Sequence, residues 1–198
     1  MITGLRPETF KHLQLNAGLF LVGFQYDTAT SAEQLKTAIA SFIEAGTGVI
    51  GATTGDGTFV CKPEIRNIEA NGMRAPFVGS TVNDGWTVTM TGTMKEITPE
   101  NMARALISAD VITPEGKTGV KQVKLRNEIK ASDYIPSLCW VGDTSEGYML
   151  IELKNALNIA GATFTFKDKG EGELPFEFQA HQGSVSDSEY APCVIVYF

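Results

Sequence analysis

The sequence predicts a mainly β fold with two α-helices, built as a single domain with an arm and a long insertion. Most of the chain alternates apolar and polar residues with a period of two, as half-buried strands do. Only two segments combine helical spacing with capping residues. At 198 residues, of which 43% are hydrophobic, the chain is long enough to bury a core without disulfides or metals.

The N-terminal segment, about residues 1–27, is expected to form an arm or an extended strand. Its apolar run at 17–24 is shorter than the roughly 20 residues of a membrane span, and glycines at 18 and 23 disfavour a helix. The first residues lack the charged and apolar regions of a signal peptide. We therefore expect synthesis and folding in a cytoplasm, without membrane insertion.

The segment after residue 30 predicts the first helix. Thr30 and Glu33 have the spacing of a capping box, and Gly46 follows the segment as a C-terminal glycine often does. Apolar residues recur between them at helical spacing: Ala32, Leu35, Ile39, Phe42 and Ile43.

A second helix is predicted from residue 98 onward. Thr98 can cap it, Pro99 suits the first helical position, and Glu100 favours the positive end of the helix dipole. Its buried stripe is expected to comprise Met102, Ala105, Leu106 and Ala109.

Residues 86–94 show the clearest strand pattern. Trp86, Val88, Met90 and Met94 are expected to face the core, while the intervening threonines face away. Similar alternation occurs at 149/151/153, 162/164/166, 176/178/180 and 194/196/198. Turn residues separate such segments: 56–57 (DG) predicts a hairpin between 49–53 and 58–62, and 169–170 (KG) predicts another turn.

Residues 110–146 are expected to form a long loop or hairpin insertion. They contain two strand-like pieces, 120–127 and 135–141, among glycine, proline and charged residues. Five basic residues lie close together in this segment: Lys117, Lys121, Lys124, Arg126 and Lys130. They form either the solvated face of a hairpin or a basic segment that contacts another subunit.

No residue pattern predicts catalysis, so we expect a protein that is not an enzyme and needs no cofactor or metal. His12 and His181 lack neighbours that would suggest a triad, and neither a nucleophile elbow nor a phosphate-binding loop is present. Cys61, Cys139 and Cys193 lack metal-ligand spacing and are expected to be buried free thiols in strands. An enzyme with a site that no motif reveals stays open as an alternative.

The net charge of −7 argues against nucleic-acid binding, which needs clustered Lys and Arg. Acidic residues outnumber basic ones most clearly in 168–189, where they comprise Asp168, Glu171, Glu173, Glu177, Asp187 and Glu189.

With these patterns, the sequence resembles the tail tube (major tail) proteins of long-tailed bacteriophages. Four segments carry the resemblance: 51–72 (GATTGDGTFVCKPEIRNIEANG), 84–106 (DGWTVTMTGTMKEITPENMARAL), 151–157 (IELKNAL), and 174–181 (LPFEFQAH) followed by 191–198 (APCVIVYF). They occur in the same order as in the family and span most of residues 51–198.

The resemblance implies a β-sandwich of two sheets flanked by a helix. Six copies would form a ring in which the inner sheets join into one barrel, and stacked rings would form a hollow tube that conducts DNA during injection. The expected location is the virion tail, after synthesis in the host bacterial cytoplasm. Expected partners are further copies and other tail proteins (tape measure, tail tip and terminator), while phage DNA passes without specific binding.

The resemblance also suggests roles for charged residues and arms. Glu171, Glu173 and Glu177 are candidates to face the lumen or a contact between rings; the alternative is a solvated loop. The N-terminal segment and residues 110–134 are candidate inter-subunit arms, because both are long and weakly patterned for a core.

Two further functions stay open. The inner tube of a contractile tail or of a phage-like injection device shares the fold, and sequence alone does not separate the two tail types. A monomeric β-sandwich binding module, for carbohydrate, would display clustered exposed aromatic residues. Trp86 and Trp140 are expected to face the core, which disfavours such a module.

Overall fold

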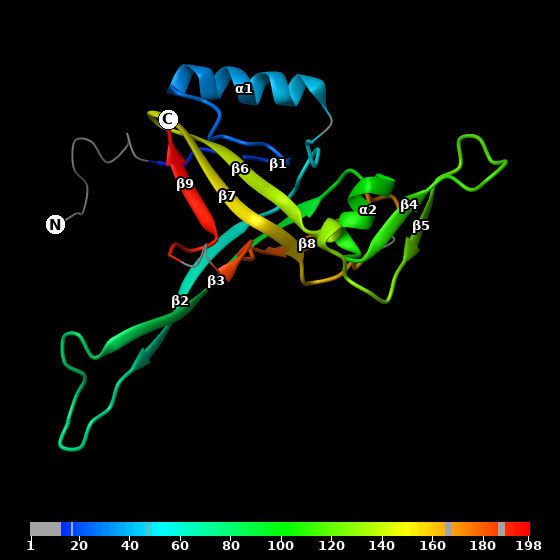
Figure 1. The fold of residues 1–198 in the computed structure, drawn as a ribbon. Helices are drawn as coiled ribbons and strands as arrows, with labels where there is room; N and C mark the ends of the chain where they lie inside the picture. The colour runs from blue at the N-terminus through cyan, green and yellow to red at the C-terminus, as the bar shows by residue number, and fades with distance from the viewer. Residues whose placement is uncertain (1–12, 17, 47, 165–167, 186–188) are drawn as a thin grey trace.

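A computed structural model describes residues 13–16, 18–46, 48–164, 168–185 and 189–198 (Figure 1). Within these ranges the expectation of a mainly β chain is confirmed, with antiparallel sheets and two α-helices. The elements are β1 (Leu19–Val22), α1 (Ala32–Ala45), β2 (Thr58–Asn67), β3 (Thr81–Met94), α2 (Pro99–Ala105), β4 (Ala109–Ile112), β5 (Gln122–Leu125), the 3-10 turn η2 (Ala131–Asp133), β6 (Ile135–Thr144), β7 (Gly147–Asn158), β8 (Leu174–Gln179) and β9 (Cys193–Tyr197).

The main sheet of the described residues has seven strands in the order β1-β6-β7-β8-β3-β2, with β9 also paired to β7. One edge of β7 serves two partners, because residues 149–153 pair with β9 and residues 157–158 pair with β8. The sheet therefore has a β6–β7 half (β1, β6, β7 and β9) and a β3–β8 half (β2, β3 and β8). The resemblance implies two separate sheets, whereas these seven strands form one hydrogen-bonded sheet.

The bend between the halves lies at Asn155 in β7. Its φ of 47° is in the left-handed region, which asparagine tolerates better than most residues. The Asn155 amide donates to the His181 carbonyl at 3.2 Å, and the His181 backbone N–H donates to the Lys154 carbonyl at 2.9 Å. These bonds attach the end of β8 to the bend, and they account for His181 as a polar residue at a strand end.

The β6–β7 half is apolar on both faces because it is the middle layer of the molecule. One face packs against α1, in a cluster that includes Leu21, Leu35, Ile39, Cys139 and Leu150. The other face packs against the β3–β8 half, in a cluster that includes Phe20, Val88, Leu153, Phe176 and Phe178. Neighbouring residues on one strand serve opposite faces. The described body thus consists of three layers, α1, the β6–β7 half and the β3–β8 half (Figure 1).

The first predicted helix is present, but its capping box was wrong. The N-cap is Ser31, whose side chain accepts from the Gln34 backbone N–H at 3.3 Å. Thr30 instead lies one residue outside the helix and donates to the Gln34 side chain at 2.7 Å. Gly46 ends the helix with a φ of 66°, as predicted.

The second predicted helix is confirmed at its start and is shorter than expected. The Thr98 side chain accepts from the Asn101 N–H at 3.1 Å, and Pro99 occupies the first turn. The helix ends at Ala105, and Ile107 adopts a φ of 70° that reverses the chain into β4. Ala109 therefore belongs to β4 and not to the helical stripe.

Two strand predictions were wrong. The DG turn at 56–57 does not close a hairpin: β2 pairs with β3 through the loop 68–80, while Val49 and Thr53 form only isolated bridges. A ten-residue antiparallel partner provides more hydrogen bonds than a short local one, so it prevails over the turn signal. Residues 162–164 are not a strand, and Phe166 lies outside the described residues. The turn at 168–170 is confirmed.

Burial of Trp86 and of the cysteines also differs from expectation. Trp86 has the phase of the core residues Val88 and Met90, yet its position lies beyond the layer that covers them, and it is 42% exposed. Cys139 is buried as predicted, whereas Cys61 is exposed and Cys193 is half-buried. Strand phase sets the face of a side chain, but only the neighbouring layer decides whether that face is covered.

The segments expected to form an arm and an insertion each consist of parts with different structures. Residues 19–22 form β1 at the edge of the sheet, and residues 1–12 and 17 lie outside the described residues. Within 110–146, β4 and β5 form a separate hairpin, whereas residues 135–144 form β6, which pairs with both β1 and β7.

Candidate assembly surfaces

The longest projection of the described chain is the β2–β3 hairpin. Its pairing runs from Thr58↔Thr91 to Asn67↔Thr81, with a bulge after Glu64. Figure 1 shows it extending far beyond the layered body. A bidentate ion pair holds the two strands together near the far end: Arg66 donates to the Asp84 carboxylate at 2.7 and 3.0 Å. This hydrogen bonding lowers the pKa of Asp84.

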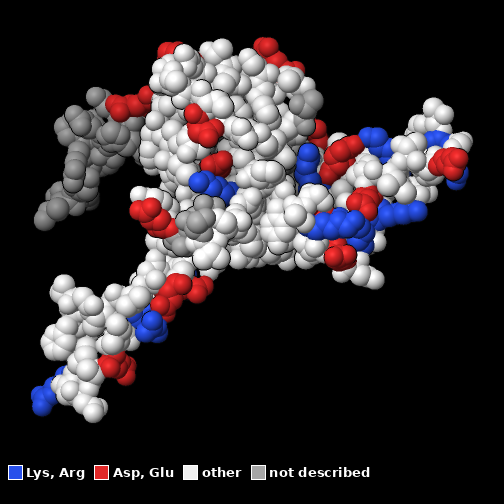
Figure 2. Space-filling model, viewed as in Figure 1, with Lys and Arg blue, Asp and Glu red and all other residues white. Residues whose placement is uncertain are grey.

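Apolar side chains without a covering layer lie along this hairpin. The loop carries Phe77, which is 64% exposed, and Val78, which is fully exposed. Closer to the body are Ile65, Ile68 and Trp86, which are also exposed. Figure 2 shows the loop end as a mainly uncharged surface. Exposed apolar residues clustered on one projection are typical of a surface that binds another protein.

Two strands of the described sheet have an unpaired edge. β2 pairs only with β3, and β9 pairs only with β7. The outward positions of β9 include Ile195, which is 46% exposed, and Tyr197, which is 73% exposed. Unpaired N–H and C=O groups on an edge strand can pair with a strand of another chain. Each edge is therefore a candidate assembly surface of a second kind.

The outer face of the β3–β8 half, which points away from α1, is polar. The register places alternate β3 threonines opposite polar or small residues of β8, with the partly exposed Thr91 beside Glu177 and the buried Thr89 beside Gln179. At the β2 side, the hydroxyls of Thr58 and Thr91 are 2.6 Å apart. The core residues Phe176 and Phe178 occupy the opposite face of β8. This surface combines hydroxyl and amide groups with the carboxylates of Glu64 and Glu177 and the ammonium group of Lys62, which lies opposite Thr87.

The three predicted acidic residues lie on or just before β8, in different surroundings. Glu171 accepts a hydrogen bond from Lys95 at 2.5 Å, which lowers the pKa of Glu171 and raises that of Lys95. The charge of Glu173 also raises the pKa of Lys95, which places its carboxylate nearby. Glu177 lies on the polar outer face. Glu171 and Glu173 therefore group with Lys95, while Glu177 belongs to the β3–β8 surface.

The five predicted basic residues do not form one uniform surface. Lys121 pairs with Glu100 of α2 at 2.5 Å, and Arg126 pairs with Asp110 at 3.0 Å and with Asp133. These two cations connect the β4–β5 hairpin to its neighbouring elements. The remaining three are exposed and form no ion pair within the described ranges: Lys117, Lys124 and Lys130. Figure 2 shows Lys and Arg gathered at this side of the molecule.

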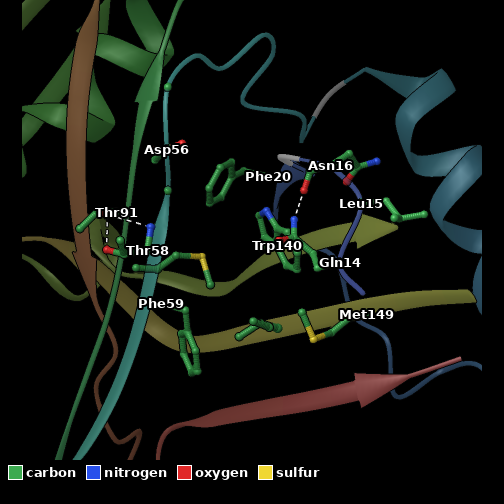
Figure 3. A pocket seen from close by; sticks show the side chains of 14 residues that line it. Gln14, Leu15, Asn16, Phe20, Asp56, Thr58, Phe59, Thr91, Trp140 and Met149 are labelled. Atoms are coloured by element: carbon green, nitrogen blue, oxygen red, sulfur yellow. Dashed lines mark hydrogen bonds between the residues drawn. The ribbon is translucent and has the colours of Figure 1, made fainter. Parts of the chain in front are cut away.

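An open cavity of about 600 Å³ lies where the two sheet halves diverge (Figure 3). Thr58 and Thr91 form one wall, and Gln14, Asn16 and Trp140 lie on the opposite side. The remaining lining includes Phe20, Asp56, Phe59, Met90, Met149 and Ile151. The cavity thus combines an apolar floor with a rim of amides and one carboxylate, as small-molecule sites often do.

The described residues contain no group of three or more His, Cys, Asp and Glu side chains arranged to hold a metal ion. None of their helices has the length and hydrophobicity needed to cross a membrane.

No protein-family model matches the chain, and comparison with curated proteins finds no similar sequence.

Sequence reasoning missed two features of these surfaces. The β2–β3 hairpin was missed because the turn signal at 56–57 drew the pairing to the wrong partner. The approach of Cys61 to Cys193 was missed because no local pattern relates residues that far apart. A signal for the hairpin was present: two long strand-like segments, 58–67 and 81–94, flank a loop that contains glycine and proline.

Proposed function

We propose that this protein is a structural subunit of a bacteriophage tail tube, in which hexameric rings stack and the lumen conducts DNA during injection. The observation that carries the proposal is the β2–β3 hairpin, which extends beyond the body with Phe77 and Val78 uncovered at its loop. An isolated monomer gains nothing from exposing these side chains. Burying each of them against another copy would contribute about 2 kcal/mol.

The unpaired edges of β2 and β9 support ring formation. A head-to-tail contact repeated by rotation closes into a ring, and the contact left over along the axis builds a stack. Edge strands that would promote aggregation in a monomer are then paired with neighbouring copies. The projecting hairpin supplies a surface that reaches beyond the body of its own subunit, as a contact between stacked rings requires.

The polar outer face of the β3–β8 half is the surface that we assign to the lumen. It lies on the side of the body opposite α1, so α1 would face outward. The ionised groups of this face are mainly acidic: Glu64 and Glu177 repel phosphates, and Lys62, opposite Thr87 in the register, is one cation beside them. A polymer of uniform negative charge would pass such a surface without sticking.

The other predicted charged residues fit contacts between subunits better than the lumen. Glu171 and Glu173 group with Lys95 beyond the end of β3, away from the middle of the polar face. Lys117, Lys124 and Lys130 lie in or just after the β4–β5 hairpin, which is a second projection (Figure 1). We assign these groups to contacts with neighbouring copies.

Negative-stain electron microscopy of the concentrated, cross-linked protein tests the proposal. Rings or tubes with six-fold end views are the expected result. Antibodies against the chain should also label phage tails along their whole length. Uniform small particles together with unlabelled tails would overturn the proposal. Co-purification with a sheath protein would assign the chain to the inner tube of a contractile tail or injection device.

A monomeric binding module is the second candidate, and two observations favour it. The cavity of about 600 Å³ has the polar rim and apolar floor of a ligand site, and Trp86 is exposed, contrary to the expectation that disfavoured this function. Binding on a glycan array with one ligand per monomer, and sedimentation as a monomer at every concentration, would favour this function over a tube subunit.

A further inference from the structure

Two cysteines that are 132 residues apart in sequence meet in the fold. The Cys61 and Cys193 sulfurs are 3.9 Å apart, with Cys61 in β2 and Cys193 at the start of β9. In the register, Cys61 lies opposite Val88, which is fully buried, so both side chains point toward the core side of the hairpin. The contact therefore lies at the root of the projecting hairpin, where the β3–β8 half meets β9.

The third cysteine is separated from this pair. Cys139 is fully buried in the cluster beneath α1, and its sulfur lies 3.4 Å from the Ser137 hydroxyl. It has no access to solvent and no contact with the other two sulfurs. The exposed Cys61 is the accessible member of the pair, and its neighbour Cys193 is half-buried.

We propose that Cys61 and Cys193 are an oxidation site that forms an intrachain disulfide in the presence of a small disulfide such as oxidised glutathione. In the first step the Cys61 thiolate attacks oxidised glutathione, forming a mixed disulfide and releasing one glutathione thiolate. In the second, the Cys193 thiolate attacks the Cys61 sulfur, which completes the disulfide and releases the second glutathione. Two thiols lose two protons and two electrons, and oxidised glutathione takes up both electrons.

The order of the two steps follows from the exposure of Cys61 and the burial of Cys193. Burial first, and then the neighbouring Cys61 thiol, raise the pKa of Cys193 to about 12 in the reduced chain. The contribution of burial persists once Cys61 is in the mixed disulfide, so the pKa of Cys193 stays raised and little of it is thiolate at neutral pH. Cys61 is exposed and meets the oxidant first. The second step should then be slow and should accelerate with rising pH, although the contact between the sulfurs gives Cys193 a high effective concentration.

The disulfide would join two edge strands of different sheet halves. It would anchor the root of the β2–β3 hairpin to β9 and would close a loop of more than a hundred residues, which constrains the unfolded chain strongly. This inference does not depend on the proposed tube function.

The test treats the purified chain with oxidised glutathione, alkylates free thiols under denaturing conditions, and digests it for mass spectrometry. The expected product is a peptide pair linked through Cys61 and Cys193, with Cys139 alkylated, and a thermal midpoint raised by several degrees until a reductant is added. Cys193→Ser should instead hold one glutathionyl group on Cys61. Cys139→Ser is the matched control and should form the link as the parent does.

Other products would overturn the proposal. One is a glutathionyl group that persists on Cys61 of the parent chain at pH 9, with Cys193 still alkylatable. Another is a dimer linked through Cys61 of two chains, which would show that the neighbouring thiol does not capture the mixed disulfide.

Discussion

Removing the apolar side chains at the tip of the β2–β3 hairpin should block assembly without unfolding the subunit. The double substitution Phe77→Ser and Val78→Ser replaces a side chain that is 64% exposed and one that is fully exposed. Neither belongs to a core cluster, so the free energy of unfolding should change by less than about 0.5 kcal/mol per substitution.

The effect on assembly follows from the area that a neighbouring copy would cover. Complete burial of a Phe or Val side chain contributes about 1.5–3 kcal/mol, so partial burial of both gives about 3 kcal/mol per contact. Because 1.4 kcal/mol corresponds to a factor of ten in an equilibrium constant, the concentration for half assembly should rise about 100-fold.

The assay measures the fraction of protein in rings or tubes by sedimentation and electron microscopy across a concentration series. Val185→Ser is the matched control, since Val185 is 92% exposed but lies outside both projecting hairpins. Urea unfolding of each variant checks that the subunit remains folded. Half assembly of the double variant within twofold of the parent concentration would refute the assigned contact, and so would an equal shift for Val185→Ser.

Four further predictions concern stability and the polar surface. Asn101→Ala removes the hydrogen bonds that the Asn101 side chain donates to the Ile50 and Glu96 carbonyls at 2.8 and 2.9 Å. It should lower the free energy of unfolding, measured in urea, by about 2–3 kcal/mol. The control Asn127→Ala, at an exposed position, should have little effect in the same assay. Alanine adopts a φ of 47° less readily than asparagine or glycine, so Asn155→Ala should destabilise the fold by about 1 kcal/mol more than Asn155→Gly. Both variants lose the same side-chain hydrogen bond, and equal losses of stability would argue against strain at the bend. The hydrogen bond from Arg66 lowers the pKa of Asp84 in the folded chain. The ion pair therefore stabilises the hairpin at a pH above the unfolded pKa of about 3.8, and this stabilisation is lost as the pH falls through the lower folded pKa. Asp84→Asn should abolish that part of the acid-unfolding profile. Glu177→Lys should leave folding unchanged but make assembled tubes retain DNA in a co-sedimentation assay at low salt, and tubes that retain no more DNA than the parent would contradict the lumen assignment.

The sequence determined the local structure where neighbouring residues provide the signal. Thr98 and Pro99 begin α2, and Gly46 ends α1, because caps satisfy the free backbone groups of the same helix. The alternation at 176/178/180 placed Phe176 and Phe178 in the core, because successive side chains of a strand point to opposite faces. These properties depend on a few adjacent residues and can be inferred from them.

Only the tertiary structure decided what covers each face and which strands pair. Trp86 continues the phase of Val88 but lies past the covering layer, so it is exposed. Cys61 meets Cys193 because the packing of the two sheet halves brings β2 close to β9, although the two cysteines are 132 residues apart in the sequence. The unpaired edges and the polar outer face likewise arise from strand order, and Phe77 and Val78 are exposed because no layer covers the hairpin loop. Burial and strand pairing are set by long-range contacts, whose free energy depends on the whole fold, and a period of two along one strand carries no information about its neighbour.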